Sequence, residues 1–186
     1  MSAEKVVLVS ECGAPLGLQD KMQAHIDGAL HLAFSVLLYR QGENEREYLL
    51  QQRALTKYHS GGLWTNTCCS HPRDGEAFIK AGARRLIEEM GLTLEKPLRD
   101  IGHFIYCADL DNALIEHELD HVLIAEVETL TFTPNPEEVM ATQWIPRRAL
   151  LDKLASSPQQ FTAWFNSVLL MADEYLERQN PQPVEE

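Results

Sequence analysis

The chain has 186 residues, a length typical of one domain, and its hydrophobic content of 45% is enough for an ordinary core. Its formal net charge of -12 argues against nucleic-acid binding and against attraction to an anionic membrane. The first residues, MSAEKVVLVS, lack the apolar core of a signal peptide, and no apolar run is long enough to span a membrane. We therefore expect a single cytoplasmic domain over residues 1–186, with reduced cysteines.

Runs of apolar residues predict six strands, because β-branched and aromatic side chains favour extended backbone. The expected strands are Lys5–Ser10, His31–Tyr39, Glu47–Arg53, Leu98–Cys107, Glu118–Glu128 and Glu138–Ile145. The second is apolar throughout, which indicates burial on both faces. A turn through Gly13, Pro15 and Gly17 should follow the first strand, and Ala54–Gly62 should be a loop that is mobile or faces phosphate.

Three segments have the periodicity of helices. The first has Asp74 as a plausible N-cap and Gly91 where a C-terminal glycine belongs. The others are Pro146–Ala155 and Pro158–Arg178, followed by a tail, 180–186, that should be frayed. Because no repeat or linker is present, we expect one α+β domain, an α/β/α sandwich.

The stretch from Leu63 to Leu92 carries two chemical signals. Its first part is expected to be extended, so alternation places Cys69 and His71 on one face and Cys68 on the other. In the helix that follows, two adjacent glutamates each lie four residues after an arginine. By itself that spacing indicates only a solvated helical face with ion pairs.

Histidines and carboxylates elsewhere are compatible with a metal site. Glu116 and Glu118 point to the same face of an extended segment, and such carboxylates repel unless a cation or proton lies between them. Together with His25, His31 and His71 they would give three nitrogen and two oxygen ligands, suited to Mn²⁺ or Mg²⁺, with Zn²⁺ as an alternative. A histidine at the start of an apolar strand is more often a core residue, so both interpretations stay open.

The helix resembles the Nudix box, G-x5-E-x7-R-E-U-x-E-E-x-G-U, in which U is aliphatic. The residues in register are Glu76, Arg84, Leu86, Glu88, Glu89, Gly91 and Leu92. Ser70 replaces the first glycine, and Arg85 replaces a glutamate that Nudix hydrolases use to hold metal. Together with T-N-T-C-C-S-H-P just upstream, these departures are similar to type 1 isopentenyl diphosphate isomerases. The resemblance covers nearly the whole chain and implies a mixed sheet between helices.

The resemblance also implies which residues bind metal and substrate. In similar isomerases a divalent ion is held by residues matching His25, His31, His71, Glu116 and Glu118. A second Mg²⁺ arrives with the diphosphate and is held by the residue matching Glu89. The diphosphate is cradled by residues matching Lys21, Arg53, Lys57 and Arg85. Charge-assisted bonds of this kind would offset the long-range repulsion of an anionic substrate.

The implied reaction is a 1,3-allylic proton shift that interconverts isopentenyl and dimethylallyl diphosphate through a tertiary carbocation. Cys69 and Glu118 match the two catalytic residues, with Glu118 as the expected proton source and the reverse order left open. Tyr106 matches a tyrosine that hydrogen-bonds the carboxylate, and Trp164 matches a ring that stabilises the cation. Without the resemblance, Trp164 would be interpreted as a core residue, as Trp64 is.

Two other functions compete with this interpretation. One is a Nudix hydrolase acting on a nucleoside diphosphate derivative, which Arg85 disfavours. The other is an inactive Nudix-like binding module, which the full set of candidate ligands disfavours. We expect no flavin, since no flavin fingerprint occurs, and a monomer or weak homodimer whose partner is a small isoprenoid diphosphate rather than nucleic acid or membrane.

Overall fold

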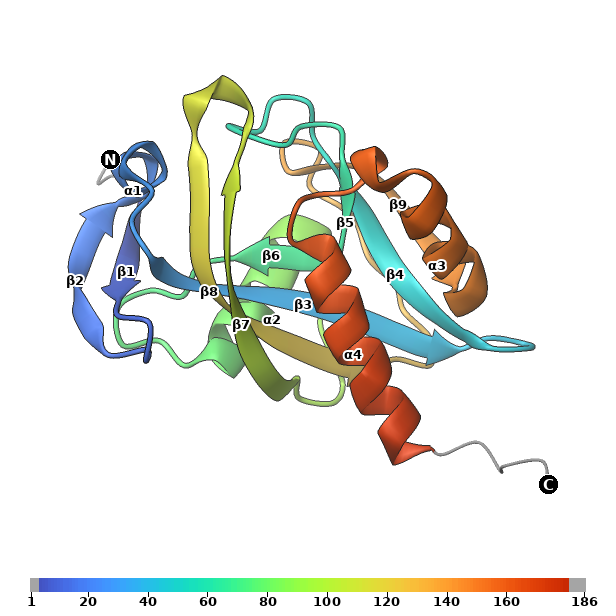
Figure 1. Ribbon diagram of the computed structural model, residues 1–186. Helices are drawn as coiled ribbons and strands as arrows, with labels where there is room; N and C mark the ends of the chain where they lie inside the picture. Colours follow the sequence, from blue (N-terminus) through green and yellow to red (C-terminus); the bar gives the residue numbers. More distant parts are fainter. Residues whose placement is uncertain (1–3, 181–186) are drawn as a thin grey trace.

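The computed structural model describes residues 4–180, and strand β3 (His31–Gln41) lies at the centre of its mixed sheet (Figure 1). Along one edge β3 pairs in parallel with β8 (Ile115–Glu126). Along the other edge it pairs antiparallel with β6 (Cys68–Ser70) and then with β4 (Arg46–Arg53). This central position explains why the sequence of β3 is apolar throughout.

The remaining elements extend this sheet or cover it. The other strands are β1 (Lys5–Val9), β2 (Pro15–Asp20), β5 (Trp64–Thr65), β7 (Arg99–Asp109) and β9 (Val139–Pro146). The helices are α1 (Lys21–Asp27), α2 (Phe78–Met90), α3 (Arg147–Ser156) and α4 (Phe165–Gln179). None of the helices described between residues 4 and 180 is long and apolar enough to cross a membrane.

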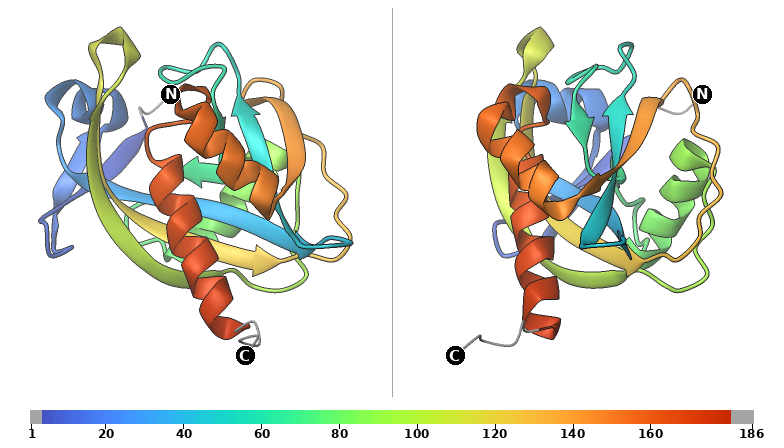
Figure 2. Two further views of the ribbon diagram at one scale, coloured as in Figure 1. Left: turned by 45° about the vertical axis from the view of Figure 1, so that its right-hand side comes forward. Right: turned by 90° about the vertical axis from the view of Figure 1, so that its right-hand side faces the viewer.

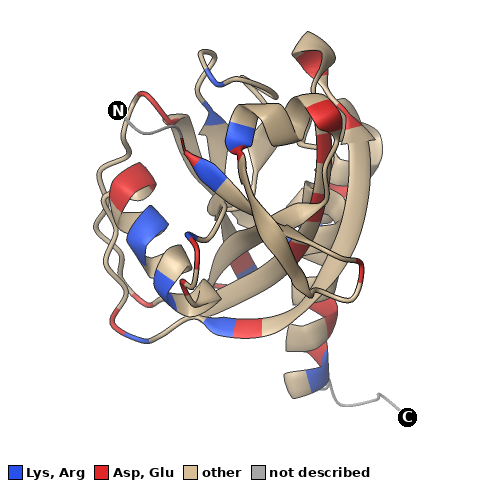
Figure 3. Cartoon of the chain, turned by 90° about the vertical axis from the view of Figure 1, so that its left-hand side faces the viewer, with Lys and Arg blue, Asp and Glu red and all other residues tan. Residues whose placement is uncertain are grey.

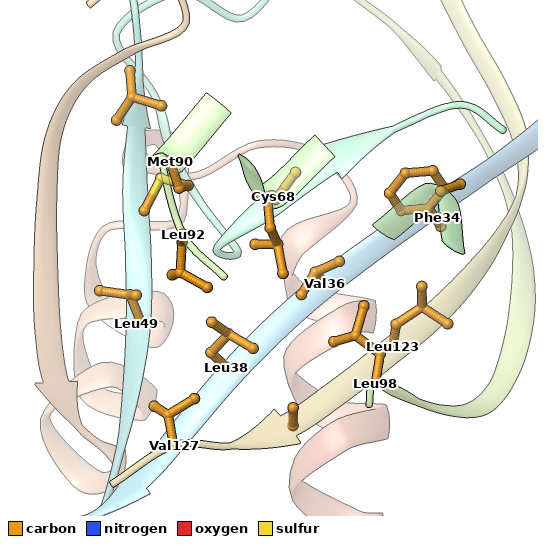
Figure 4. Close-up of a cluster of buried hydrophobic side chains, with 14 residues drawn as sticks. Phe34, Val36, Leu38, Leu49, Cys68, Met90, Leu92, Leu98, Leu123 and Val127 are labelled. Carbon is orange, nitrogen blue, oxygen red and sulfur yellow. The ribbon is translucent and has the colours of Figure 1, made fainter. Parts of the chain in front are cut away.

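Two hydrophobic cores lie on opposite sides of β3, because successive side chains of a strand point to opposite faces. Val36 and Leu38 belong to the core beneath α2, which Figure 4 shows, whereas Leu37 belongs to the core beneath α4. Figures 1 and 2 show α2 and α4 on opposite sides of the sheet. The expected α/β/α sandwich is confirmed.

Helix α2 begins later than the sequence indicated. The prediction that Asp74 caps it is wrong: the N-cap is Ala77, which has no side-chain capping bond. Gly75 has a φ of 71°, and the Glu76 side chain accepts a bond of 3.0 Å from the Arg73 amide, so these residues form a turn before the helix. Gly91 ends the helix in the left-handed conformation, as predicted.

The last predicted helix is interrupted, and the predicted first turn is shifted. Residues Pro158–Gln160 form a short 3₁₀ turn, after which Phe161 bridges to Trp64 of β5. That pairing keeps the backbone extended, so α4 starts only after Trp164, which is its N-cap. The stretch predicted as a turn around Pro15 is instead the edge strand β2, where a missing N–H is tolerated. The predicted frayed tail beyond Asn180 lies outside the described residues.

Gly91 offers a test of this packing. A Cβ there would lie 2.5 Å from the backbone oxygen of Thr133, and φ is +59°. We expect Gly91→Ala to lower the free energy of unfolding by about 2–4 kcal/mol, the sum of left-handed strain and overpacking. Gly75→Ala is the control, because its φ is +71° but nothing lies within 4 Å of its Cβ. Urea denaturation should show a clearly smaller loss for Gly75→Ala, and equal losses would contradict the steric argument.

Candidate active site

Strand register places three predicted site residues in one row across the sheet. Glu118 of β8 pairs with His31 of β3 on one side and with Tyr106 of β7 on the other. Strand β8 begins at Ile115, three residues earlier than predicted, so Glu116 also lies in the strand and shares the face of Glu118. The predicted pairing of the two carboxylates on one face is thus present in the structure.

Three histidines from separate elements converge on this row. His25 lies in the last turn of α1, a helix that the Asp20 side chain caps by accepting from the Gln23 amide. His31 starts β3, and His71 follows β6. The ring centroids of His25 and His31 lie 5.1 Å apart, as do those of His31 and His71. The sequence analysis named all three, and the structure brings them together.

Backbone contacts orient two of these rings toward Glu116. The Nδ1 atom of His25 is 2.6 Å from the Lys21 carbonyl, and the Nδ1 atom of His31 is 2.8 Å from the Ala29 carbonyl. Each Nδ1 therefore donates, which leaves Nε2 with a lone pair in the neutral ring. These Nε2 atoms lie 3.0 and 3.6 Å from Oε1 of Glu116.

Those converging acceptors fit a cation. His25 Nε2, His31 Nε2 and Glu116 Oε1 are buried and have no hydrogen-bond partner. With a nitrogen of His71 they form a group of potential ligand atoms that all lie within 4.8 Å of one another. Buried lone pairs facing each other are costly unless a positive charge lies between them. The nitrogen and oxygen donors suit Mn²⁺, Mg²⁺ or Zn²⁺.

Glu118 has a different environment from its neighbour. Its Oε2 lies 2.9 Å from His71 Nε2 and 3.4 Å from His31 Nε2, and the Tyr106 hydroxyl donates to Oε1. Burial would raise the pKa of Glu118, but the nearby imidazoles of His31 and His71 hold it well below its usual value. Burial and the charge of Glu118 raise the pKa of Glu116 well above its usual value. Without a cation, the pair holds one negative charge.

The two adjacent cysteines have separate environments, as alternation predicted. Cys68 is fully buried in the core beneath α2 and is labelled there in Figure 4. Cys69 faces the other side, where it lines a cavity together with Glu116 and Glu118. Burial raises the pKa of the Cys69 thiol to about 12, although Arg53, 3.9 Å from the sulfur, acts in the opposite direction.

Trp164 closes this cavity from the N-terminus of α4. Its ring is 3% exposed, and its indole nitrogen donates to Asn66 Oδ1 over 3.2 Å. The Arg53 guanidinium lies 5.6 Å from the ring centroid, which gives a direct cation–π contact. The cavity is small in this structure, with a volume of about 30 Å³.

Three of the four predicted diphosphate-binding cations already pair with carboxylates. Lys21 lies 2.5 Å from Glu4, and Lys57 pairs with Glu138. Arg85 bonds Glu89 over 2.6 Å and contacts Glu88, and in Figure 3 basic and acidic bands follow one another along α2. The fourth, Arg53, donates to the His59 carbonyl. The two i,i+4 ion pairs expected from the sequence, Arg84 with Glu88 and Arg85 with Glu89, are present in α2.

Glu89 lies apart from the histidine cluster. It is 4% exposed. Gln51 donates to its Oε2 over 3.2 Å, and Arg85 donates to its Oε1. Glu138 pairs with Lys57 and lies 3.8 Å from Arg85, the residue that also bonds Glu89. Glu138 was not predicted as a site residue. An acidic residue in a polar run gives no signal of this contact.

His59 and Tyr58 are also missing from the predicted site, although both line the cavity. His59 Nε2 lies 3.0 Å from Glu116 Oε2, and burial together with Arg53 lowers the pKa of His59 to about 2. The sequence analysis treated both residues only as part of the loop Ala54–Gly62. A fourth histidine in a loop was the one available signal, but only the folded loop places it near Glu116.

Comparisons with known proteins agree with this geometry. Residues 29–165 match the NUDIX domain. Relatives named isopentenyl-diphosphate Delta-isomerase include one from Photobacterium profundum, 61% identical over 89% of this chain and 92% of its own. Another, from Aliivibrio fischeri, is 46% identical over 95% of this chain and 99% of its own. The chain belongs to the isopentenyl-diphosphate Delta-isomerases of the NUDIX domain family.

Solved structures support the same fold. The DR0079 protein of Deinococcus radiodurans has a TM-score of 0.66 at 17% identity, over 92% of this chain and 99% of its own. The Nudix hydrolase RenU of M. smegmatis has a TM-score of 0.60 at 20% identity, over 96% of this chain and 98% of its own. At these identities the likeness concerns the fold alone. The predicted Nudix-like mixed sheet is confirmed.

If Glu116 binds a metal ion, replacing it should affect stability differently in the metal-free and the metal-bound protein. Glu116→Gln replaces a carboxyl group whose ionisation the metal-free site disfavours, so metal-free stability should be unchanged or higher. In wild type, Mn²⁺ at about 100 times its dissociation constant should stabilise by about 2.7 kcal/mol. The variant should lose most of that gain, and elemental analysis should show less metal per chain. Equal Mn²⁺ stabilisation of both proteins in thermal melts would contradict the coordination.

Thiol reactivity tests the cysteine environments. Only the thiolate is alkylated, so a Cys69 pKa of about 12 leaves about one thiol in 10⁴ reactive at pH 8. Its labelling rate should rise tenfold per pH unit from pH 8 to 10. Exposed Cys12, whose pKa is lowered mainly by the Ser10 hydroxyl, should be labelled first and become nearly pH-independent earlier. Iodoacetamide pulses with peptide mapping measure both rates, and comparable labelling at pH 7.5 would contradict this assignment.

Proposed function

We propose that this protein interconverts isopentenyl and dimethylallyl diphosphate by a metal-dependent 1,3-allylic proton shift. The observation that carries the proposal is that Cys69, Glu118 and Trp164 line one cavity, and that His31 and His71 lie within 3.4 Å of Glu118. The names of the relatives support this substrate pair. A cavity with two proton-transfer groups and an aromatic wall suits a hydrocarbon that becomes a cation.

Proton delivery is assigned to Glu118. An unactivated alkene is a weak base, and a thiol whose pKa is near 12 is too weak an acid to protonate it. Glu118 gives its proton to the terminal carbon, and the tertiary cation forms at C3. Cys69 then removes a proton from C2, and the electrons of that C–H bond form the new double bond. The pKa shifts of the free site favour the opposite arrangement, so the reactive form, with the proton on Glu118 and the negative charge on Cys69, is a minor protonation state that Arg53 beside the sulfur favours.

A divalent ion would be held by His25, His31, His71, Glu116 and Glu118. When bound, it would neutralise the carboxylate pair and make a proton on Glu118 more acidic. Mn²⁺ or Mg²⁺ is our assignment for this site, with Zn²⁺ as the alternative. Tyr106 holds Glu118 in place through its hydroxyl, and the ring face of Trp164 stabilises the cation, an interaction worth about 2 kcal/mol when desolvated.

The diphosphate is assigned to the neighbourhood of Arg53, Lys57, Arg85 and Lys21. Glu4 pairs with Lys21 and Glu138 pairs with Lys57, so the diphosphate must displace these two carboxylates to bind the lysines. A second Mg²⁺, brought in with the diphosphate, is assigned to Glu89, whose oxygens would then be shared with Arg85. The replacement of one anion by another explains how a chain with a net charge of -12 holds an anionic substrate.

The compartment follows from thiol chemistry. All four cysteines are free, and an ionised Cys69 must not be consumed by oxidation. A reducing environment such as the cytosol meets that requirement.

The decisive experiment is incubation with isopentenyl diphosphate and Mg²⁺ in D₂O, followed by NMR. We expect deuterium in an allylic product, because the proton added at the terminal carbon comes from a group that exchanges with solvent. Intact isopentenyl diphosphate, with turnover of a nucleoside diphosphate derivative instead, would overturn the proposal in favour of the hydrolase alternative.

Cys69→Ser and Cys68→Ser are a matched pair for the same assay. Cys69→Ser should lower kcat by at least about 10³-fold, within the usual acid–base contribution of about 10²–10⁴. Cys68→Ser places a hydroxyl in an apolar core, so it should cost about 1–3 kcal/mol of stability and leave kcat within a few-fold. Chemical denaturation supplies the stability values. If Cys68→Ser were the inactive variant, the assignment of the catalytic face would be wrong.

A further inference from the structure

A fourth histidine, His59, adjoins the cluster formed by His25, His31 and His71. The ring centroids of those three lie 5.1 or 5.8 Å apart, and the His59 ring lies 5.6 Å from that of His25. His59 lines the same cavity as His71 and Glu116, and only 1% of it is exposed. The spacing therefore places His59 in the ligand cluster, although it is not among the five ligands assigned to the metal above.

The Nε2 atom of His59 faces a carboxylate oxygen without forming a hydrogen bond to it. It lies 3.0 Å from Oε2 of Glu116, but among the described residues it has no hydrogen-bond partner. His25 Nε2 and His31 Nε2 are also buried without such a partner in the described part of the chain. A buried polar atom left in this state is costly. Three imidazole nitrogens around one carboxylate share the same need, and one cation would meet it for all three.

The other nitrogen of the ring leaves the Nε2 lone pair available for a metal. An Nε2–H group would be buried here without an acceptor, whereas Nδ1 lies 2.9 Å from the Ser60 hydroxyl, which can accept a hydrogen bond. The proton of the neutral ring therefore belongs on Nδ1. Burial and the charge of Arg53 lower the pKa of His59 to about 2, which agrees with a neutral ring. Neutral imidazole is the form of histidine that binds metals.

The distance between His59 and Glu116 matches that of two neighbouring ligands on one ion. Adjacent ligands of an octahedral ion, each about 2.1 Å from the metal, lie about 3.0 Å apart. His59 Nε2 and Glu116 Oε2 are separated by 3.0 Å, and so are His25 Nε2 and Glu116 Oε1. Each oxygen of Glu116 thus has an imidazole nitrogen at the spacing of a shared ion.

The loop that carries His59 is fastened to the strand pair that carries the carboxylates. The Ser60 amide donates to Asp111 Oδ1 over 2.8 Å, and the Asn112 side chain donates to the Tyr58 carbonyl over 3.2 Å. Asp111 and Asn112 lie in the turn between β7 and β8, and Figure 1 shows this turn at the same end of the molecule as the loop after β4. These bonds hold His59 in place relative to the ligands on β8.

We propose that His59 is a further ligand of the divalent ion and binds it through Nε2. The inference rests on the metal site of the proposed isomerase and adds a fourth imidazole to it. Imidazole suits transition metal ions, whereas carboxylate and water suit Mg²⁺. With four imidazoles and two carboxylates, the site should select Mn²⁺ or Zn²⁺ over Mg²⁺. The loop that provides Lys57 for the diphosphate thus also provides a ligand for the metal.

Metal selectivity tests the ligand. Mn²⁺ alone is titrated into the full-length protein without diphosphate and followed by EPR, and Mg²⁺ is then added as a competitor. The variant is His59→Phe, which keeps an aromatic ring beside Trp164 but has no nitrogen. Loss of an outer-shell partner typically costs about 10–100-fold in metal affinity, so loss of a direct ligand should weaken Mn²⁺ binding at least about 10-fold. Mg²⁺ affinity should change by no more than about threefold, because Mg²⁺ readily keeps water in place of a protein ligand.

Pulsed EPR of the bound Mn²⁺ counts the coordinated imidazoles. We expect four in wild type and three in His59→Phe. His59→Gln, which is smaller and polar, should also give three, so the count does not depend on how well phenylalanine is accommodated. His103→Gln is the matched control, since His103 is an exposed histidine of β7 that stacks beside His121. That variant should keep the wild-type count and the wild-type Mn²⁺ affinity.

Three coordinated imidazoles in wild type would overturn the proposal. So would unchanged Mn²⁺ affinity in His59→Phe, or equal weakening of Mn²⁺ and Mg²⁺ binding, which would make the ring a packing residue. Because no substrate is present, these readouts are independent of the reaction. Deuterium missing from the product of isopentenyl diphosphate would remove the proposed function and leave the imidazole count valid. An active isomerase with three imidazoles in wild type would keep the function and lose this inference.

Discussion

The organisation of this site depends on two carboxylates buried side by side. Glu116 and Glu118 are 2% and 6% exposed, and histidine nitrogens surround them. Such a pair is stable only if a cation or a shared proton balances it. The same requirement gives the site its chemistry, because a proton forced onto or off a buried carboxylate is readily exchanged. The metal binding and the proton transfer that we propose would both follow from this one electrostatic constraint.

The sheet makes that arrangement rigid. β3 is packed on both faces, so its first residue, His31, is positioned by two cores at once. Its pairing partner β8 places Glu118 opposite His31, and β7 places Tyr106 opposite Glu118. The other ligands arrive from a capped helix and from the end of a short strand. A small shift of any of these elements would separate the ligands, so the site is as stable as the sheet itself.

The charged groups of the candidate site form two separate regions with different needs for counter-charge. The histidine cluster has an excess of acceptors and attracts cations, whereas the region around Arg85 and Lys57 has cations already paired with Glu89 and Glu138. The Nudix box has a glutamate at the position of Arg85. A cation there suits the anionic diphosphate that we propose as the substrate.

The sequence by itself determined the features that depend only on residues close together in the chain. Alternation separated Cys68 from Cys69, the continuous apolar run identified β3, and Gly91 marked the end of α2, because each depends on neighbouring residues only. The resemblance then named the ligands. Only the tertiary structure decided that Phe161 pairs with β5 and breaks the last helix, and that the loop carries His59 to Glu116. Those contacts join residues far apart in the chain, and no local pattern encodes such distances.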